Sequence, residues 1–222
     1  MIEERLATTP YTPVSWPLVP GRTALVVIDM QNDCIHPDGR YAQCGVDVEH
    51  MRRAIAPTRR LVDAARAASV PIIWVRHGFR DRQDAGILGS LRAFLDDAGL
   101  RPGTWGYQIA DEMDARPDDI YIDKSRLSAF YGTDLERMLQ DLETETLLVC
   151  GVMTNQCVKA TVADASYRDI KPIVVAEATG AALPRLHGPA LEMIAVSLGE
   201  VRSFDQALED LERISGQGGI AR

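Results

Sequence analysis

The stretch VCGVMTNQCVKATVADA, residues 149–165, joins an apolar run to a helical segment and places a cysteine where they meet. The apolar run stops at Gly151, and small polar residues follow it. From Cys157 onward the apolar residues recur at helical spacing. A buried strand that leads directly into a helix is the repeating unit of α/β folds, so this stretch sets the expectation for the rest of the chain.

Four other apolar runs resemble the strand in this stretch, because each is short, rich in branched residues and bounded by turn residues. The five predicted strands are 24–29, 71–77, 120–124, 146–152 and 172–179. Amphipathic stretches between them predict covering helices at 48–69, 133–143, 154–169 and 188–198, with a kink at Pro57. A shorter strand at 199–204 and a helix from Asp205 complete the alternation. This order predicts an α/β fold in three layers: a doubly wound, mostly parallel six-stranded sheet with helices on both faces.

The length and composition favour a single domain. The chain has 222 residues, of which 46% are hydrophobic, enough for one large core. Prolines predict an extended N-terminal arm at 1–20, the single domain spans 21–214, and 215–222 form a flexible tail.

Charge and cysteine usage exclude several classes of function. The net charge is −8, from 24 basic and 32 acidic residues without a basic cluster, which argues against nucleic acid as a partner. No segment is apolar enough to predict a signal peptide or a membrane span, so we expect a soluble, cytoplasmic protein. The four cysteines form no CxxC pair and are expected to be free thiols; Cys34, His36 and Cys44 do not have zinc-ligand spacing.

Three chemically distinct side chains lie at predicted strand exits. Asp29 ends the first strand, Lys124 ends the third, and Cys157 follows the fourth. In doubly wound sheets ligands bind beyond the carboxyl ends of the strands. Each residue also has a simpler interpretation: Asp29 could cap a turn, Lys124 could reach solvent or pair with Asp123, and Cys157 could be an inert core residue.

Together the three side chains predict nucleophilic chemistry. A nucleophilic thiol needs a proton acceptor, a nearby cation and a helix N-terminus that favours the thiolate. Thr154 or Asn155 as N-cap would place Cys157 in the first helical turn, where free backbone N–H groups suit an anion. The junction is therefore expected to activate a thiol and to hold an oxyanion.

The segments around these residues carry a family resemblance. ALVVIDMQNDC, IDKSRLSAF and VCGVMTNQCV resemble the three signature segments of the isochorismatase-like cysteine hydrolases, in the order of that family. The resemblance extends over roughly residues 20 to 205 and implies a catalytic triad of Asp29, Lys124 and Cys157. It also implies a cis peptide bond between Val152 and Met153, an oxyanion hole formed by the backbone N–H groups of Met153 and Cys157, and a homo-oligomer, either a dimer or a tetramer.

A further resemblance concerns the substrate. GTWGYQIADEM (103–113) and the segment 118–139 resemble the ureidoacrylate amidohydrolases and the biuret and triuret hydrolases. The implied function is a cysteine-dependent amidohydrolase that cleaves a C–N bond of a small ureido or carbamoyl compound through a thioester. Neither a metal nor another cofactor is implied, because VRHGFRDRQDAG lacks the metal-binding D-x-H segment of nicotinamidases. The alternatives are a nicotinamidase-like or other small-amide hydrolase and, in a different class, a catalytically silent binding module.

Several residues near the three motifs are candidates for the substrate pocket. Amides would satisfy the polar groups of a ureide, aromatic rings would wall the site, and Arg76 with Arg80 could clamp a carboxylate. Trp105 and Tyr107 could close the pocket or pack against another subunit, and the segment 177–194 is expected to overhang it. Turn chemistry and core packing are the competing interpretations for Gln31 and Phe130. The substrate-binding candidates are Gln31, Asn32, Phe130, Tyr131, Arg76 and His77.

Overall fold

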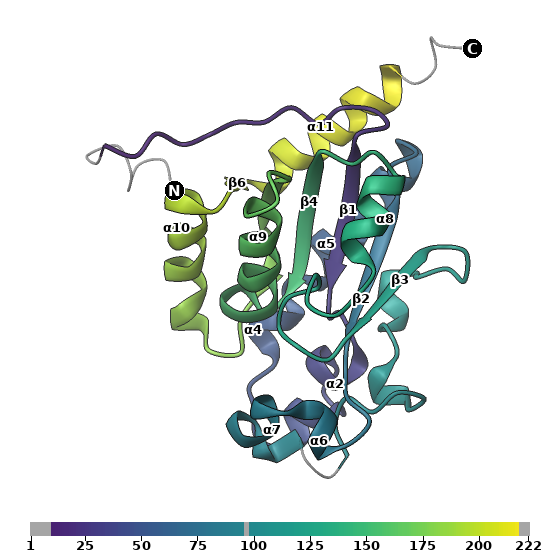
Figure 1. The fold of residues 1–222 in the computed structure, drawn as a ribbon, viewed down its shortest axis with the longest axis vertical. Coiled ribbons are helices and arrows are strands. Elements are labelled where there is room, and N and C mark those ends of the chain that lie inside the picture. Colours follow the sequence, from purple (N-terminus) through teal and green to yellow (C-terminus); the bar gives the residue numbers. More distant parts are fainter. Residues whose placement is uncertain (1–9, 96–97, 218–222) are drawn as a thin grey trace.

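A computed structural model describes residues 10–95 and 98–217, and its centre is a six-stranded sheet (Figure 1). The strand order is β3-β2-β1-β4-β5-β6, and each neighbouring pair is parallel. The strands are β1 (Thr23–Ile28), β2 (Ile72–His77), β3 (Ile120–Lys124), β4 (Thr146–Val152), β5 (Lys171–Gly180) and β6 (Glu200–Arg202). The predicted doubly wound α/β fold is confirmed, and the sheet is parallel throughout these pairs.

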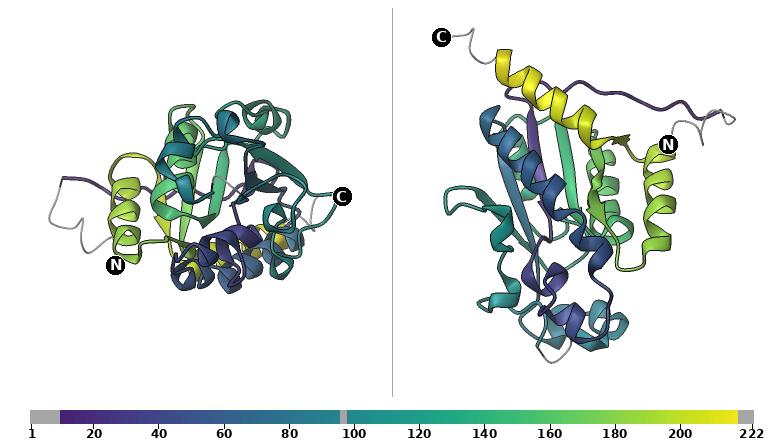
Figure 2. Two further views of the ribbon diagram at one scale, coloured as in Figure 1. Left: turned by 90° about the horizontal axis from the view of Figure 1, so that it is seen from below. Right: turned by 180° about the vertical axis from the view of Figure 1, so that it is seen from behind.

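Helices cover both faces of the sheet, as the view along the layers shows (Figure 2). One face is covered by α4 (Glu49–Arg52), α5 (Ile55–Ala67) and α11 (Phe204–Gln217). The other face is covered by α8 (Leu135–Asp141), α9 (Lys159–Ser166) and α10 (His187–Ser197). Two hydrophobic clusters, one on each face, hold the three layers together.

The central strands divide their side chains between these clusters by simple alternation. Val26 of β1 and Val149 of β4 belong to the cluster under α8 and α9, whereas Leu25 and Leu148 belong to the cluster under α5 and α11. All four side chains are fully buried, and each contributes about 1.5–3 kcal/mol through burial of apolar surface. This packing fixes the two strand ends between which the candidate site lies.

Short helices and turns lie beyond the carboxyl ends of the strands, at the lower end of Figure 1. The α-helical pieces are α2 (Asn32–Ile35), α3 (Arg40–Gln43), α6 (Arg82–Ala85) and α7 (Ile87–Leu91). The 3₁₀ turns are η1 (Ala93–Leu95), η2 (Trp105–Tyr107), η3 (Asp111–Met113) and η5 (Pro184–Leu186).

The predicted helix 48–69 is divided rather than kinked. It forms α4 and α5, and Pro57 occupies the first turn of α5, where its missing N–H is not needed for a helical hydrogen bond. At the C-terminus, α11 continues to Gln217, so the first three residues of the predicted tail are helical because this helix packs against α5. The rest of that tail lies outside the described residues.

The described part of the predicted arm, from residue 10, has no regular secondary structure and runs past the amino ends of the strands (Figure 1). Its backbone is bound to the edge strand β6 at Trp16. The Trp16 N–H donates to Glu200 Oε2 at 2.7 Å, and Arg202 donates to the Trp16 carbonyl at 2.6 Å. Among the described helices, none is both long enough and apolar enough to cross a lipid bilayer.

Candidate active site

The candidate site lies where the direction of the strand connections reverses. Strands β1 and β4 are neighbours, β2 and β3 extend the sheet to one side, and β5 and β6 extend it to the other. A crevice forms at such a point beyond the carboxyl ends of the strands. Asp29 follows β1 at this crevice, and Cys157 lies in the helical turn that follows β4.

The backbone after β4 has an unusual conformation that places the cysteine. Gly151 has a φ of +105°, and a Cβ atom there would lie 2.1 Å from the carbonyl oxygen of Ile28 on β1, so only glycine fits. The next peptide bond but one, between Val152 and Met153, is cis. The chain then forms the π-helical turn η4 (Thr154–Val158) before α9 begins.

The predicted N-cap is wrong. Met153 occupies the N-cap position of this turn and makes no side-chain capping hydrogen bond. Thr154 is not available as a cap because its Oγ1 pairs with His187 Nδ1 at 2.9 Å, and Asn155 Oδ1 is buried without a hydrogen-bond partner among the described residues. The position of Cys157 therefore depends on the glycine contact and the turn.

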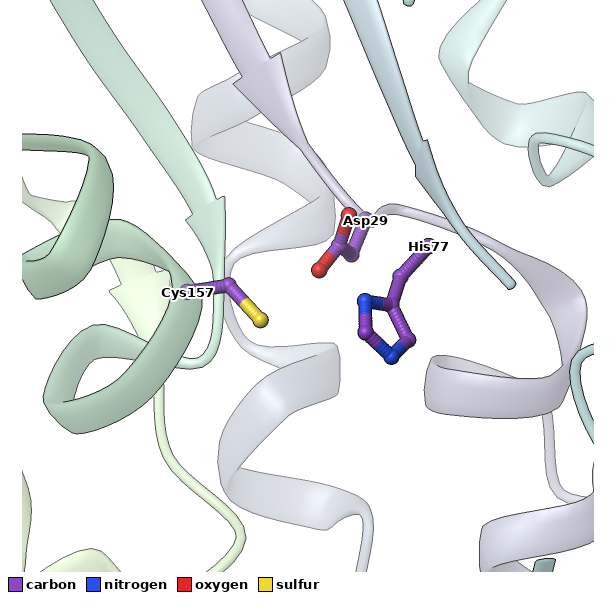
Figure 3. A group of neighbouring side chains, drawn as sticks. All are labelled: Asp29, His77 and Cys157. Atoms are coloured by element: carbon purple, nitrogen blue, oxygen red, sulfur yellow. The ribbon is translucent and has the colours of Figure 1, made fainter. Parts of the chain in front are cut away.

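A buried ammonium group joins the ends of three strands. Lys124 Nζ donates to Asp29 Oδ2 at 2.9 Å and to the Arg126 carbonyl at 3.1 Å, and it lies 2.9 Å from His77 Nδ1. Asp29, His77 and Cys157 point toward one another (Figure 3), and their candidate ligand atoms all lie within 4.8 Å of each other. The structure thus brings the three predicted triad residues together and adds His77 to them.

His77 is a neutral acceptor in this arrangement. Burial and the nearby Lys124 ammonium hold the pKa of His77 well below its usual value. Because the ammonium can only donate, Nδ1 accepts from Lys124 and we assign the ring proton to Nε2. The Nε2 atom is buried and has no hydrogen-bond partner among the described residues.

The electrostatics favour an uncharged thiol at rest. Burial and the charge of Asp29 raise the pKa of Cys157 to about 11, against smaller lowering effects of Lys124 and Arg92. Burial also raises the pKa of Asp29, although Lys124 offsets part of that rise. Burial, the largest single effect, would lower the pKa of Lys124, but the charges and hydrogen bonds of Asp29 and Cys157 together outweigh it and the pKa is raised. The expected thiolate is therefore not the resting form, and the thiol proton must leave during the reaction.

Asp29, His77 and Cys157 are ligand types that could in principle hold a divalent metal ion. The Lys124 ammonium already lies within hydrogen-bond distance of Asp29 and His77, the two ligands that such an ion would need. A second cation beside this buried ammonium would be strongly repelled. The donor set therefore fits the lysine better than it fits a metal.

Most of the predicted pocket residues have structural roles instead. Gln31 uses its whole amide on the backbone, donating to the His77 and Tyr107 carbonyls at 3.0 and 2.9 Å and accepting from His77 N–H at 2.7 Å. Asn32 donates to the Trp105 carbonyl at 2.9 Å. These amides hold the η2 turn against the end of β1.

Both arginines of the predicted clamp are paired with acidic residues. Arg76 forms an ion pair with Asp123 at 2.7 Å and stacks on the rings of Tyr107 and Tyr121. Arg80 is exposed and pairs with Asp84. Both guanidinium groups therefore already have carboxylate partners: Asp84 lies four residues after Arg80 in the sequence, whereas Asp123 is brought beside Arg76 by the register of β2 and β3.

The aromatic candidates separate in the same way. Phe130 is buried in the cluster under α8 and α9, whereas Tyr131 is 66% exposed. Tyr107 is buried, and the half-exposed Trp105 ring contacts His36 edge-on. Of the six predicted substrate-binding residues, His77 is the one that contacts the triad.

Sequence reasoning missed a hollow of about 750 Å³, whose lining includes Met153 and Gln156 next to the segment that carries Cys157 but none of the three triad residues. Three of its lining residues form a polar group: Arg92 donates to the Gln156 side-chain carbonyl and, at 3.4 Å, to the Tyr41 hydroxyl. The isolated arginine in the apolar run GILGSLRAFL was the available signal in the sequence. Part of the predicted overhang does contribute, through Ala182, Leu183 and Pro184.

Comparison with known proteins agrees with this fold. The isochorismatase domain matches residues 23–206. A ureidoacrylate amidohydrolase (RutB) from Methylobacterium radiotolerans is 35% identical over 217 residues, which cover 90% of this chain and 84% of that protein. The chain belongs to the isochorismatase family, which confirms the resemblance expected from the three motifs.

Solved structures extend the comparison. A cysteine hydrolase from Pseudomonas syringae superposes with a TM-score of 0.85 at 29% identity, covering 93% of this chain and all of the other. The N-carbamoylsarcosine amidase from Thermoplasma acidophilum has a TM-score of 0.69 at 26% identity, covering 83% of this chain and 97% of that one.

Proposed function

We propose that the protein is a cysteine-dependent amidohydrolase that cleaves a C–N bond of a small ureido or carbamoyl compound. The observation that carries this proposal is the buried Cys157 thiol beside a carboxylate that is held by a buried ammonium. Relatives named as a ureidoacrylate amidohydrolase and an N-carbamoylsarcosine amidase support the substrate class.

In the first half of the reaction Asp29 acts as the general base. Its carboxylate takes the thiol proton while Sγ of Cys157 attacks the planar carbonyl carbon of the substrate. The carbonyl oxygen becomes an oxyanion, which the backbone N–H groups of Met153 and Cys157 stabilise. Among the described residues the Met153 N–H donates no backbone hydrogen bond, so it is free for this role.

In the second half the proton leaves Asp29 again. Protonated Asp29 donates this proton to the departing nitrogen, and the C–N bond breaks. Ammonia or an amine is released, and the rest of the substrate remains bound to Cys157 as a thioester. Water then attacks the thioester with Asp29 as the base, and the returned proton restores the thiol. Each bond formed is matched by a bond broken, and no further reactant is needed.

Lys124 orients the groups that exchange this proton. Its ammonium fixes the orientation of Asp29 through the 2.9 Å hydrogen bond and offsets the negative charge that passes from the carboxylate to the sulfur. His77 receives another of the ammonium hydrogens, so the lysine side chain is held from two sides.

The test is ammonia release from biuret, triuret, ureidoacrylate, N-carbamoyl amino acids and nicotinamide, measured for the wild type and for Cys157→Ala. We expect turnover of at least one ureide, reduced at least about 10³-fold in Cys157→Ala. Cys44→Ala is the matched control, because Cys44 is a thiol on α3's C-cap that bonds the Phe94 carbonyl outside the triad.

The control should keep its activity, and circular dichroism should show that both variants are folded. Substantial turnover by Cys157→Ala would contradict the covalent scheme. Hydrolysis of nicotinamide alone, or of nothing in the panel, would contradict the ureide assignment.

A further inference from the structure

The hollow beside the triad combines apolar walls with a single cationic group. Its lining residues are Tyr41, Gly45, Val46, Asp47, Leu88, Leu91, Arg92, Phe94, Leu127, Met153, Gln156, Ala182, Leu183 and Pro184. Leu88, Leu91, Phe94 and Leu183 give it a largely apolar surface. A cavity with apolar walls and a few converging polar groups is the usual form of a site for a small organic ligand.

Arg92 is the cationic group, and its hydrogen-bond partners are uncharged. Its guanidinium donates to the Tyr41 hydroxyl and to the Gln156 amide oxygen, and the described residues supply no carboxylate to it. The one acidic residue in the lining, Asp47, is exposed and accepts the N–H of Glu49 at 2.9 Å.

Two other arginines with little exposed surface have carboxylate partners, whereas Arg52 and Arg126 donate to backbone carbonyls. Arg66 pairs with Asp119 at 2.6 Å, and Arg202 pairs with Glu200 at 2.6 Å and with Asp210 at 2.7 Å. A partly buried guanidinium without such a partner loses hydration without gaining an ion pair. An anionic ligand would supply the missing charge.

Arg92 also lies close to the reacting groups. Its charge contributes to lowering the pKa of both Asp29 and Cys157. Its partner Gln156 directly precedes Cys157 in the η4 turn, so the arginine is bound to the segment that carries the nucleophile. A small molecule whose carbonyl lies at Cys157 can therefore place its other end near Arg92.

We propose that Arg92, with the Tyr41 hydroxyl, binds a carboxylate of the substrate, and that the preferred substrates are ureides that carry a carboxylate. This inference rests on the proposed function for the identity of the reacting end. The planar guanidinium can present two parallel N–H groups to a carboxylate, and the apolar walls accommodate the carbon atoms between carboxylate and ureide. Uncharged ureides such as biuret leave the arginine without its anion and are poorer substrates.

The experiment compares a carboxylated ureide with its methyl ester, which removes the charge and keeps the ureide. Ammonia release is measured with ureidoacrylate or an N-carbamoyl amino acid and with the matching ester, for the wild type, Arg92→Gln and Arg92→Lys. For Arg92→Gln we expect kcat/KM to fall about 10- to 100-fold on the acid, mainly through KM, and less than about threefold on the ester. Arg92→Lys keeps the charge but loses the fork, and we expect an intermediate loss on the acid.

Arg76→Gln is the matched control, because Arg76 is an arginine near a strand exit whose guanidinium pairs with Asp123 outside the hollow. This control should leave the ratio of acid to ester unchanged. An equal loss on acid and ester in Arg92→Gln would overturn the inference, because Arg92 would then act on the thiol or on the fold. A wild type that prefers the ester would overturn it as well.

A binding measurement separates this inference from the proposed function. Titration calorimetry should show that Cys157→Ala binds the carboxylated ureide and that adding Arg92→Gln weakens this binding. The ester should bind to Cys157→Ala more weakly than the acid does. If the wild type hydrolyses no ureide but this difference in binding is seen, the proposed function fails while the carboxylate site stands. If neither ligand binds with any dependence on Arg92, the carboxylate site fails.

Discussion

At the scale of single residues, the central problem of this site is the proton on Cys157. A thiol whose pKa is raised to about 11 is almost entirely protonated at neutral pH, so attack requires that a base remove the proton. Asp29 can serve because Lys124 keeps its carboxylate oriented and partly offsets the effect of burial. The reaction then moves a proton over one short path instead of relying on a stored thiolate.

This arrangement predicts a broad bell-shaped pH dependence of kcat/KM. Activity should fall as pH decreases through the pKa of Asp29, which burial raises above its usual 3.8, because protonated Asp29 cannot accept the thiol proton. Activity should fall again as pH rises through about 11, because deprotonated Cys157 leaves Asp29 without a proton for the leaving nitrogen.

Steady-state kinetics from pH 4 upward, together with the pH dependence of iodoacetamide alkylation of Cys157, would check both limbs. An alkylation midpoint near neutral pH would contradict the uncharged resting thiol. Lys124 is expected to keep its charge around neutral pH, since Asp29 and Cys157 together outweigh the effect of burial and raise its pKa.

The sequence allowed prediction of the triad but not of its surroundings. Asp29, Lys124 and Cys157 could be placed because strand exits of a parallel sheet converge, and the structure brings these residues together. Arg76 was a reasonable clamp by position, yet its partner Asp123 lies on the neighbouring strand β3, and that register appears only in three dimensions. Arg92 was missed because its position depends on how the connection after β2 folds over the site.

At the scale of elements, the contact between β4 and β1 controls the direction in which η4 leaves the sheet. We expect Gly151→Ala to destabilise the protein by about 3 kcal/mol or more, because a methyl group would overlap the Ile28 carbonyl in a backbone conformation with φ of +105°. Urea unfolding followed by circular dichroism would measure this change.

Gly188→Ala in α10 is the corresponding control, because a Cβ there meets no atom within 4 Å. It should be neutral or stabilise by up to about 1 kcal/mol, since alanine favours a helix. Equal stability of the two variants would show that the β1 contact does not constrain the turn.

Element boundaries were predictable where hydrophobic pattern dominates. The five long strands agree with prediction to within one residue, because buried parallel strands appear as continuous branched runs. The start of the helix carrying Cys157 was harder, since Thr154 looks like a cap in sequence but bonds His187 from α10 instead. At Thr154 a tertiary hydrogen bond therefore replaces the capping bond that the local sequence predicts.

At the scale of the whole molecule, a second buried ionic group lies at the sheet edge, away from the triad. Arg202 contacts Glu200, Asp210 and the Trp16 carbonyl, so it connects β6, α11 and the N-terminal arm. We expect Arg202→Met to destabilise the protein by about 3–5 kcal/mol, because it leaves the buried Glu200 carboxylate with no cation among the described residues, while Asp210 keeps only the exposed Arg213. Chemical denaturation would measure the loss.

Arg137→Met tests the same change at an exposed pair. Arg137 and Asp141 are both solvent-exposed on α8, so the expected loss is below about 1 kcal/mol. A similar small loss for Arg202→Met would mean that the edge network does not hold the arm.

The fold class followed from the alternation of strands and helices, but the order of strands did not. Alternation fixes parallel pairing and right-handed connections, whereas the position of the reversal between β1 and β4 depends on which faces pack together. Oligomeric state, cytoplasmic location and the absence of a metal remain predictions of the sequence.

The strand order determines how much of the chain must fold before the proposed triad can form. Asp29 follows β1 and Lys124 ends β3, whereas Cys157, the proposed nucleophile, follows a strand that begins at Thr146. No local segment contains the site, since even the hydrogen bond from Lys124 to Asp29 spans 95 positions of the chain. The reactivity of the Cys157 sulfur therefore depends on the correct pairing of strands that lie far apart in the sequence. A measurement of turnover would also measure the fraction of molecules whose sheet has formed completely.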